Sequence, residues 1–215
     1  MNTAIDHLVV VAHDLAQGVA WCESTLGVTP APGGKHPLMG THNRLVGLDG
    51  QRSYLEIIAI DPDAPPPGRS RWFGMDRLAD TVRDTPRLVH VVVRSTNLDM
   101  HRWGLVAAGC NPGTTLSAQR ETPHGLLRWR ISVRADGVRL AGGALPALIE
   151  WQGAHPADAM DAPQLTLAAL EVAGLDDATW AALAPRNVQR RRDAPPLRAV
   201  FDSPNGRVTL DATSS

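Results

Sequence analysis

The feature that most constrains the fold is an internal repeat, in which one order of elements occurs twice along the chain. An apolar run, an amphipathic stretch and further strand-like runs follow one another in residues 4–60, and the same order returns in residues 87–152. Each unit carries a histidine in its first run and a glutamate in its last: His7 with Glu56, and His90 with Glu150. Recurrence at this scale indicates one supersecondary unit built twice.

The first unit shows how its elements are predicted. The apolar run AIDHLVVV is typical of a buried strand. A helix is expected next, because Asp14 is a suitable N-cap, apolar residues recur at helical spacing up to Leu26, and Gly27 follows. Strand-like runs come after a Pro/Gly loop, and the pair Asp49-Gly50 favours a hairpin between two of them.

The whole chain is expected to form one α+β domain. Two βαβββ modules would form a curved, mostly antiparallel sheet around a cavity, with a partial third module at the C-terminal end. The third stretch repeats the strand and helix but lacks a histidine at the position of His7. The predicted divisions are the first module at 1–61, a linker with an aromatic loop at 62–86, the second module at 87–153 and the partial third module at 164–212.

Composition excludes several classes of function. The formal net charge of the 215 residues is -1, which argues against binding a polyanion such as nucleic acid. No apolar run approaches the roughly 20 residues that span a bilayer, so no membrane partner is expected. The two cysteines, Cys22 and Cys110, do not form a CxxC pair and read as reduced thiols. The sequence therefore predicts a cytoplasmic protein.

The repeated histidines and glutamates suggest a shared site. Strand alternation places each of these side chains on a face that is otherwise apolar, where an ionisable group is costly without a partner. Two imidazoles and two carboxylates would suit a divalent metal such as Zn, Ni, Fe or Mn, with positions left open for substrate. Two separate hydrogen-bonded pairs without a metal are an equal alternative. The predicted ligands are His7, Glu56, His90 and Glu150.

The same residues carry a family resemblance. Paired strand–helix–three-strand modules with this His/Glu placement resemble the vicinal oxygen chelate superfamily. The segments DHLVVVAHDL, LGVTPAPGGKHPLMGTHNRLVGL, YLEIIAIDPDAP, RWFGMD and LIEW are similar to the glyoxalase-like domain proteins. The resemblance covers residues 4–152 well and the C-terminal third loosely.

The resemblance implies a small-molecule enzyme of the lyase or isomerase type. A metal would polarise vicinal oxygens of the substrate while Glu56 or Glu150 moves a proton. The alternative is a metal-free protein that sequesters a small ligand, and extradiol ring cleavage ranks below both. Members of the superfamily commonly dimerise, so a homodimer is a further expectation, although two modules in one chain can close a cavity by themselves.

Other residues are candidates for the same cavity. In the segment MGTHNR, His42 is a rival ligand or general acid–base, and Asn43 and Arg44 are candidate substrate contacts. In RSRWFG, Trp72 is a candidate lid residue or interface anchor, with a simple cover over the core edge as the plainer alternative. In LLRWRISV, Arg128 and Arg130 share one strand face. They would bind a substrate carboxylate or phosphate if that face lines the cavity, and would be a solvated face otherwise.

Overall fold

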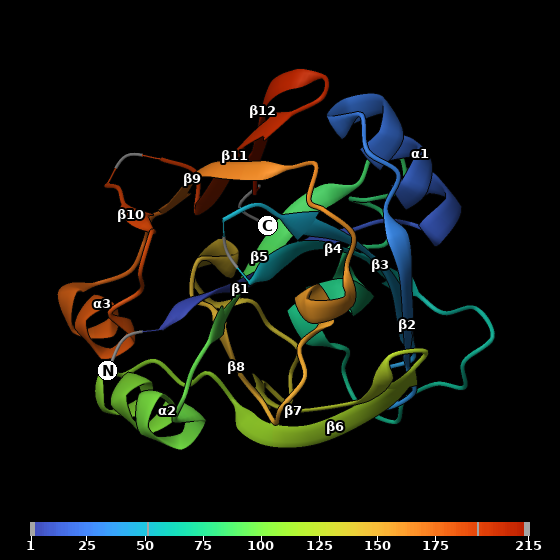
Figure 1. Cartoon of the computed structure of the whole chain (residues 1–215). Helices are drawn as coiled ribbons and strands as arrows, with labels where there is room; N and C mark the ends of the chain where they lie inside the picture. Colours follow the sequence, from blue (N-terminus) through green and yellow to red (C-terminus); the bar gives the residue numbers. More distant parts are fainter. Residues whose placement is uncertain (1–2, 51, 193, 213–215) are drawn as a thin grey trace.

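The computed structural model describes residues 3–50, 52–192 and 194–212. The chain folds as α+β, with one eight-stranded sheet, a second four-stranded sheet and few helices (Figure 1). The predicted fold class is therefore confirmed. Residues 1, 2, 51 and 193 of the predicted modules lie outside the described part of the chain.

The first βαβββ unit follows the expected order. Its helix begins after Asp14, whose side chain accepts from the backbone N–H of Gln17, and ends at Gly27, where φ is +72°. A left-handed residue at a helix C-terminus favours glycine, because no Cβ clashes there. The elements are β1 (Ala4–Val11), α1 (Leu15–Leu26), β2 (Ala31–His36), β3 (Thr41–Leu48) and β4 (Ser53–Ile60).

The second unit repeats this topology. Its elements are β5 (Arg87–Arg94), α2 (Leu98–Ala107), β6 (Thr114–Thr122), β7 (Gly125–Val133) and β8 (Ala147–Trp151). In both units the first and last strands pair in parallel, β1 with β4 and β5 with β8, and the middle strands add antiparallel. The strand order of the whole sheet is β2-β3-β4-β1-β5-β8-β7-β6, with β1 and β5 antiparallel at its centre.

The curvature of this sheet brings its two edges together. A Cβ placed on Gly34 in β2 would lie 2.5 Å from Cδ of Arg120 in β6. A Cβ at this position would force the Arg120 side chain to shift, so the two edge strands lie close together here. The sheet thus encloses a concave side, which lies between the two modules (Figure 1).

The third unit covers the outer face of the large sheet and does not extend it. Its elements are β9 (Thr166–Val172), α3 (Asp177–Leu183), β10 (Gln189–Arg190), β11 (Leu197–Ser203) and β12 (Gly206–Asp211). Leu170, Leu197 and Phe201 of this unit share a hydrophobic core with Val91 and Val93 of β5. The strand order β10-β9-β11-β12 also differs from that of the two full modules. The partial third repeat is therefore a cover for the convex face.

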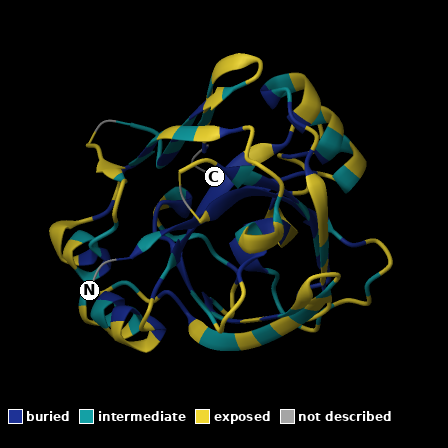
Figure 2. Ribbon diagram, in the orientation of Figure 1, coloured by how far each residue is buried: buried dark blue, intermediate teal, exposed yellow. Residues whose placement is uncertain are grey.

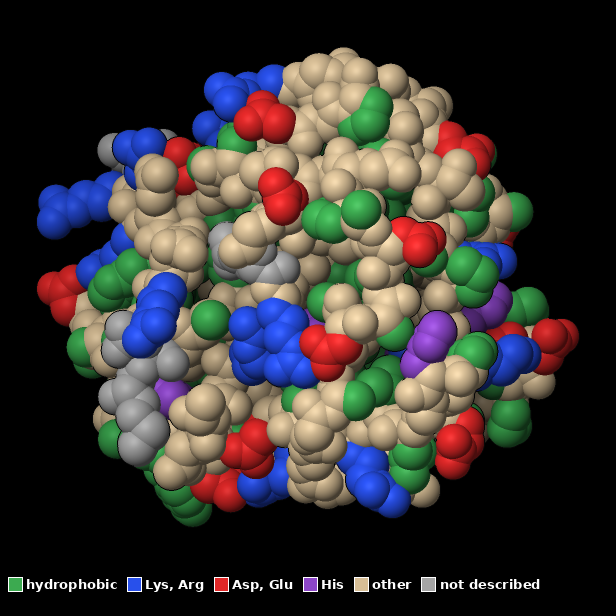
Figure 3. All heavy atoms as spheres, in the orientation of Figure 1, with side chains coloured by type: hydrophobic (Ala, Val, Ile, Leu, Met, Phe, Trp, Pro, Cys, Tyr) green, Lys and Arg blue, Asp and Glu red, His purple; other side chains and the backbone are tan. Residues whose placement is uncertain are grey.

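The central strands are buried on both sides, as Figure 2 shows for β1, β4 and β5. One core lies outside the sheet beneath α1, α2 and the third unit, and a second core lies inside it. Basic and acidic side chains are interspersed on the face seen in Figure 3, which agrees with the net charge near zero. None of the helices in the described ranges is long and apolar enough to cross a membrane.

Candidate active site

The concave side of the sheet contains a hollow of about 410 Å³, part of it open to solvent, here called the inner cavity. Both modules contribute to it, and its walls combine aromatic rings with a few polar groups. The polar side chains are His7, His36, Asn43, Glu56 and Arg120, and the aromatic ones are Tyr54, Trp72, Phe73, Trp129 and Trp151. Such a mixture is typical of a small-molecule site.

A β-bulge in β1 brings Asp6 into contact with the side chain of His7, which lines the inner cavity. Ile5 pairs with Val93 and His7 with Val92, so Asp6 is an extra residue opposite β5. Consecutive residues of a regular strand point to opposite faces, and a bulge breaks that rule. Asp6 and His7 consequently meet, with His7 Nδ1 donating to Asp6 Oδ1 at 2.8 Å.

Asp6 is fully buried and receives several donors. His155 Nε2 lies 3.1 Å from Oδ2, Trp151 Nε1 donates to the same oxygen at 3.0 Å, and Arg94 lies 3.4 Å away. Burial alone would raise the pKa of the Asp6 carboxyl, but the hydrogen bonds from His155 and His7 outweigh it and lower that pKa. Asp6 is thus a carboxylate, and an acceptor fixes the Nδ1–H tautomer of His7.

The other ring nitrogen of His7 faces Glu56. The distance from His7 Nε2 to Glu56 Oε2 is 3.6 Å, and both side chains are 6% exposed. Tyr54 stacks on the His7 ring with centroids 4.7 Å apart, and Asn43 Nδ2 donates to Glu56 Oε1 at 2.5 Å. Asp6, His7 and Glu56 therefore lie in one line. The His7 ring is in the middle, with Nδ1 bonded to Asp6 and Nε2 next to Glu56.

Arg120 enters the cavity from the second module. Its Nη1 lies 3.4 Å from both His36 Nε2 and Asn43 Oδ1. Burial lowers the pKa of His36 to about 3, and the positive charge of Arg120 acts in the same direction. His36 is therefore a neutral ring at ordinary pH.

Aromatic residues close the cavity on the side of the 3₁₀ helix Trp72–Arg77. Trp72 and Phe73 stack at 5.4 Å, and Trp72 meets His36 edge-on at 5.1 Å. Phe73 has φ of +56°, a left-handed conformation that a bulky residue rarely adopts. Trp72, a predicted site residue, thus lines the cavity. The predicted linker supplies one wall of the site.

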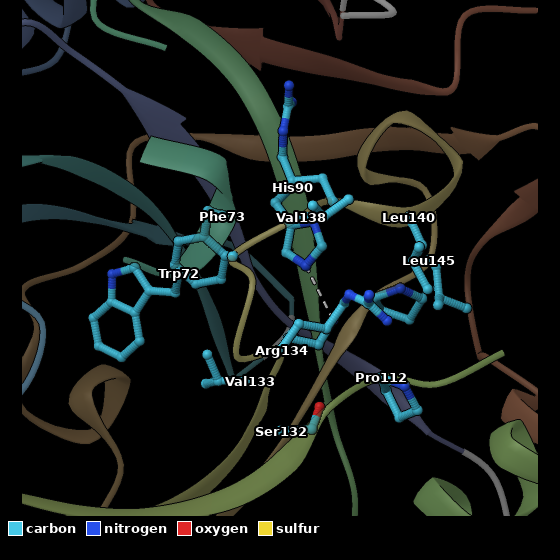
Figure 4. Close-up of a pocket in the computed structure, with 14 residues that line it drawn as sticks. Trp72, Phe73, His90, Pro112, Ser132, Val133, Arg134, Val138, Leu140 and Leu145 are labelled. Atoms are coloured by element: carbon cyan, nitrogen blue, oxygen red, sulfur yellow. Dashed lines mark hydrogen bonds between the residues drawn. The ribbon is translucent and has the colours of Figure 1, made fainter. Parts of the chain in front are cut away.

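His90 lies in a separate hollow on the far side of Phe73. Figure 4 shows Trp72 and Phe73 on one side of the His90 ring, with Leu140 and Leu145 on the other. His90 Nε2 accepts the backbone N–H of Ala147 at 3.1 Å, so that nitrogen already has a partner. Burial lowers the pKa of His90 to about 3, and Arg139 and His7 act in the same direction.

Glu150 does not enter the cavity. Its carboxylate accepts from Arg130 Nη1 at 2.9 Å and from the backbone N–H of Leu98 at 3.3 Å, at the start of α2. The reason is strand register. In the first module, Glu56 pairs with Val9, which comes two residues after His7. In the second module, the residue two positions after His90 is Val92, and it pairs with Ala147. Glu150 is three residues further along β8, and an odd offset turns a side chain to the opposite face.

The predicted four-ligand metal set therefore needs correction. A divalent ion held by His7, Glu56, His90 and Glu150 together does not fit, because Glu150 faces outward and His90 Nε2 binds a backbone N–H. Among the residues that the structure describes, no three His, Cys, Asp or Glu side chains are grouped to hold a metal ion.

The remaining predicted residues divide by strand face. Asn43 lines the inner cavity, but its neighbours His42 and Arg44 point away from it, and His42 Nδ1 lies 4.0 Å from Asp61. In β7 the side chains of Trp129 and Ile131 face the inner cavity. Arg128 is exposed and Arg130 binds Glu150 and Asp99 outside the cavity, so neither arginine contacts the site.

Sequence reasoning missed several residues of the site. Asp6 was hidden because regular alternation would point it away from His7, and no pattern marks the bulge. Arg120 and His155 come from segments without a recognisable motif. The pair Gly33-Gly34 was a usable signal, because a Cβ on Gly33 would lie 2.1 Å from Asn43 Oδ1. Two adjacent glycines in a strand often mark a close approach.

Comparisons with known proteins agree with this fold. No curated protein matches the sequence. A hypothetical protein from Staphylococcus aureus is similar in structure, with a TM-score of 0.58 and 13% identity over 98% of this chain and 86% of that one. Methylmalonyl-CoA epimerases of Streptomyces coelicolor (TM-score 0.45, 19% identity, 72% of this chain and 99% of that one) and Mycobacterium tuberculosis (0.41, 16%, 73% and 91%) are more distant.

The family comparison covers most of the chain. Residues 5–188 match the glyoxalase-like domain family, including both modules, the linker and the first part of the third unit. The resemblance inferred from the sequence motifs is confirmed by this match. The chain belongs to the glyoxalase-like domain family.

Proposed function

We propose that the protein is a small-molecule enzyme of the isomerase or lyase type, which moves a proton on a carbon next to a carbonyl group. The observation that carries this proposal is the buried line Asp6–His7–Glu56 at the inner cavity. A histidine oriented by a carboxylate, beside a second carboxylate, is a common arrangement for general acid–base chemistry.

Glu56 is the base in this proposal. Its carboxylate takes the proton from the substrate carbon, and the C–H electron pair moves into the adjacent carbonyl, which becomes an enolate. His7, protonated on Nε2, donates a hydrogen bond to the enolate oxygen. Asp6 stabilises the imidazolium through Nδ1. Return of the proton to the other face of the same carbon gives an epimer, and the carbonyl group is restored. Loss of a leaving group from the carbon next to the enolate, together with its bonding electron pair, gives a lyase product.

The surroundings support this division of roles. Asn43 donates to one oxygen of Glu56 and leaves Oε2 directed at His7. Trp72, Trp129 and Trp151 line the cavity and limit its access to water, which strengthens the electrostatic effect of His7 on a developing negative charge.

Hydrogen–deuterium exchange tests the proposal without knowledge of the product. Small ketones, 2-hydroxyketones and 2-oxo acids would be incubated with the protein in D2O, and exchange at the carbon next to the carbonyl followed by NMR. We expect exchange in at least one class, with a loss of about 100- to 10,000-fold in Glu56→Gln and His7→Gln. The matched control is Glu121→Gln, at an exposed position in β6. Exchange that persists in Glu56→Gln contradicts the assigned base.

A metal-free binding protein is the second candidate. The aromatic walls favour it, because Trp129 and Trp151 lie 5.4 Å apart and offer ring surfaces for a flat ligand. In that case a ligand would quench the tryptophan fluorescence of the protein, and no class of compound would exchange its protons.

A further inference from the structure

A second, larger hollow opens next to the inner cavity. It has a volume of about 1440 Å³, part of it open to solvent, and is here called the outer groove. Its walls are the first residues of β2, the tip of the β6–β7 hairpin, and residues 154–161, which include the 3₁₀ helix Pro156–Ala159. The three segments are far apart in sequence but lie near one another in the fold (Figure 1).

The outer groove and the inner cavity share part of their walls. Leu45, Arg120 and Pro156 line both. A molecule whose reacting end reaches Glu56 can therefore extend into the groove, and it would pass Arg120 at the junction.

Within the described part of the chain, no carboxylate pairs directly with the guanidinium of Arg120, and Asn43 lies between Arg120 and Glu56. The Nε of Arg120 is buried and has no hydrogen-bond partner among the residues that the structure describes. Its Nη1 contacts only neutral groups, at the long distance of 3.4 Å to Asn43 and to His36. A half-buried guanidinium with unused donors is a suitable partner for a carboxylate or phosphate oxygen.

The walls of the groove beyond Arg120 are mainly apolar. Pro32, Leu127, Pro156 and Met160 form much of the surface, while His124 and Asp161 stand among the polar residues. Burial of apolar surface would contribute affinity for a hydrocarbon chain. A cation beside an apolar channel is complementary to an amphipathic ligand that carries a negative charge.

We infer that the ligand is an oxyanion carried on an apolar chain, with the carboxylate or phosphate bound at Arg120 and the chain in the outer groove. This inference rests on the proposed function for its reacting end, which it places at Glu56. It adds the substrate class: acidic amphiphiles whose reacting carbon is near the charged group.

Binding, measured by calorimetry, tests the inference without turnover. The probes are straight-chain carboxylates from butyrate to decanoate, octyl phosphate, and uncharged octanamide. We expect affinity to rise about three- to fourfold for each added methylene that the groove buries. Octanoate should bind at least about tenfold more tightly than octanamide, consistent with a charge-assisted hydrogen bond. Octyl phosphate binding in place of octanoate would identify a phosphate headgroup.

Variants locate the two parts of the site. Arg120→Met should remove the preference for octanoate over octanamide, whereas Arg87→Met, at an exposed arginine that lines neither hollow, should preserve it. Met160→Trp, which narrows the outer groove, should lower the affinity for decanoate and leave the affinity for butyrate unchanged. The octanamide comparison uses the unmodified protein, so it decides the matter even where Arg120→Met does not fold. The inference is overturned if octanamide binds as tightly as both octanoate and octyl phosphate, or if affinity does not depend on chain length.

The outcomes separate this inference from the proposed function. Proton exchange in small ketones without binding of amphiphiles would refute the amphiphile inference alone. Binding of amphiphiles by a protein that exchanges no protons would refute the proposed function alone.

Discussion

The two modules share a topology but differ in what they place inside the sheet. The first directs His7, Asn43 and Glu56 to one cavity, with Glu56 next to both of the others, and Asp6 holds His7 from behind. The second directs His90 to a separate hollow and Glu150 to the outer surface. Similar sequences thus gave unlike halves, because the position of a residue in its strand decides the face on which it lies.

The difference also concerns the use of hydrogen bonds. Nδ1 of His7 donates to Asp6, and Nε2 of His7 faces Glu56. Nε2 of His90, in contrast, accepts a hydrogen bond from a backbone N–H of β8. One histidine therefore faces the carboxylate of Glu56 in the cavity, and the other supports the fold. Measurements on paired variants can break or sharpen this contrast.

The largest expected effect is on catalysis. His7→Gln should lower the rate of proton exchange about 100- to 10,000-fold, since a positioned acid–base group contributes that much. His90→Gln should change the rate less than about tenfold, because His90 does not line the inner cavity. NMR exchange rates in D2O, with folding checked by circular dichroism, provide the measurement. Equal losses in the two variants would show that the halves act as one site.

The second effect is on stability, at Asp6. Asp6→Asn should lower the free energy of unfolding by about 3–5 kcal/mol, because an amide replaces a buried carboxylate that His7, His155 and Trp151 all donate to. Urea unfolding at pH 7 measures it. Asp202→Asn is the comparison, since Asp202 pairs with Arg207 on the surface and should cost less than about 1 kcal/mol. A cost near zero at Asp6 would remove the structural basis for orienting His7.

The third effect is on pH dependence, and here the halves should agree. Burial lowers the pKa of His36 and of His90 to about 3, from 6.5 in an unfolded chain. Between these values the unfolded chain binds more protons, so the free energy of unfolding falls as pH drops below about 6.5. Each histidine should contribute up to about 1.4 kcal/mol per pH unit in that window.

Unfolding between pH 7 and pH 4.5 checks this dependence. His36→Gln and His90→Gln should each reduce the slope of the free energy of unfolding against pH. The expected reduction corresponds to about one proton fewer taken up on unfolding. A slope unchanged in either variant would mean that the ring is already charged or exposed in the folded protein.

The smallest effect is expected at Glu150. Glu150→Gln should change the free energy of unfolding by less than about 1 kcal/mol, because the partly exposed pair with Arg130 is weakened while an acceptor remains for the backbone of Leu98. The proton-exchange rate should stay within about twofold, in contrast to Glu56→Gln. A large loss of exchange would indicate that Glu150 acts in the site after all.

Much of the fold was predictable from local patterns. The apolar run around His7, the cap at Asp14 and the end of the helix at Gly27 are signals read over a few residues, and the structure has each of them. The repeat then predicted two modules, because the same signals occur in the same order. The third unit was harder, since nothing local states whether its strands join the large sheet or cover it.

The candidate site was predictable only in part. Glu56 and His7 were found because a regular strand alternates, and both lie on an otherwise apolar face. The same rule failed at Glu150, whose register with β5 depends on the length of the loop before β8. It failed at Asp6 as well, because a bulge is fixed by pairing with β5 and leaves no mark in the sequence.

The sequence by itself determined the elements, their order and the types of residue available to the site, since helix caps, strand alternation and the choice of His and Glu are local properties. The tertiary structure alone decided which of these groups meet. Strand register paired Ala147 with Val92 and turned Glu150 to the outer face. The bulge joined Asp6 to His7, and closure of the sheet brought Arg120 to the cavity. Each depends on pairing between distant strands, and a register shift by an odd number of residues reverses the outcome.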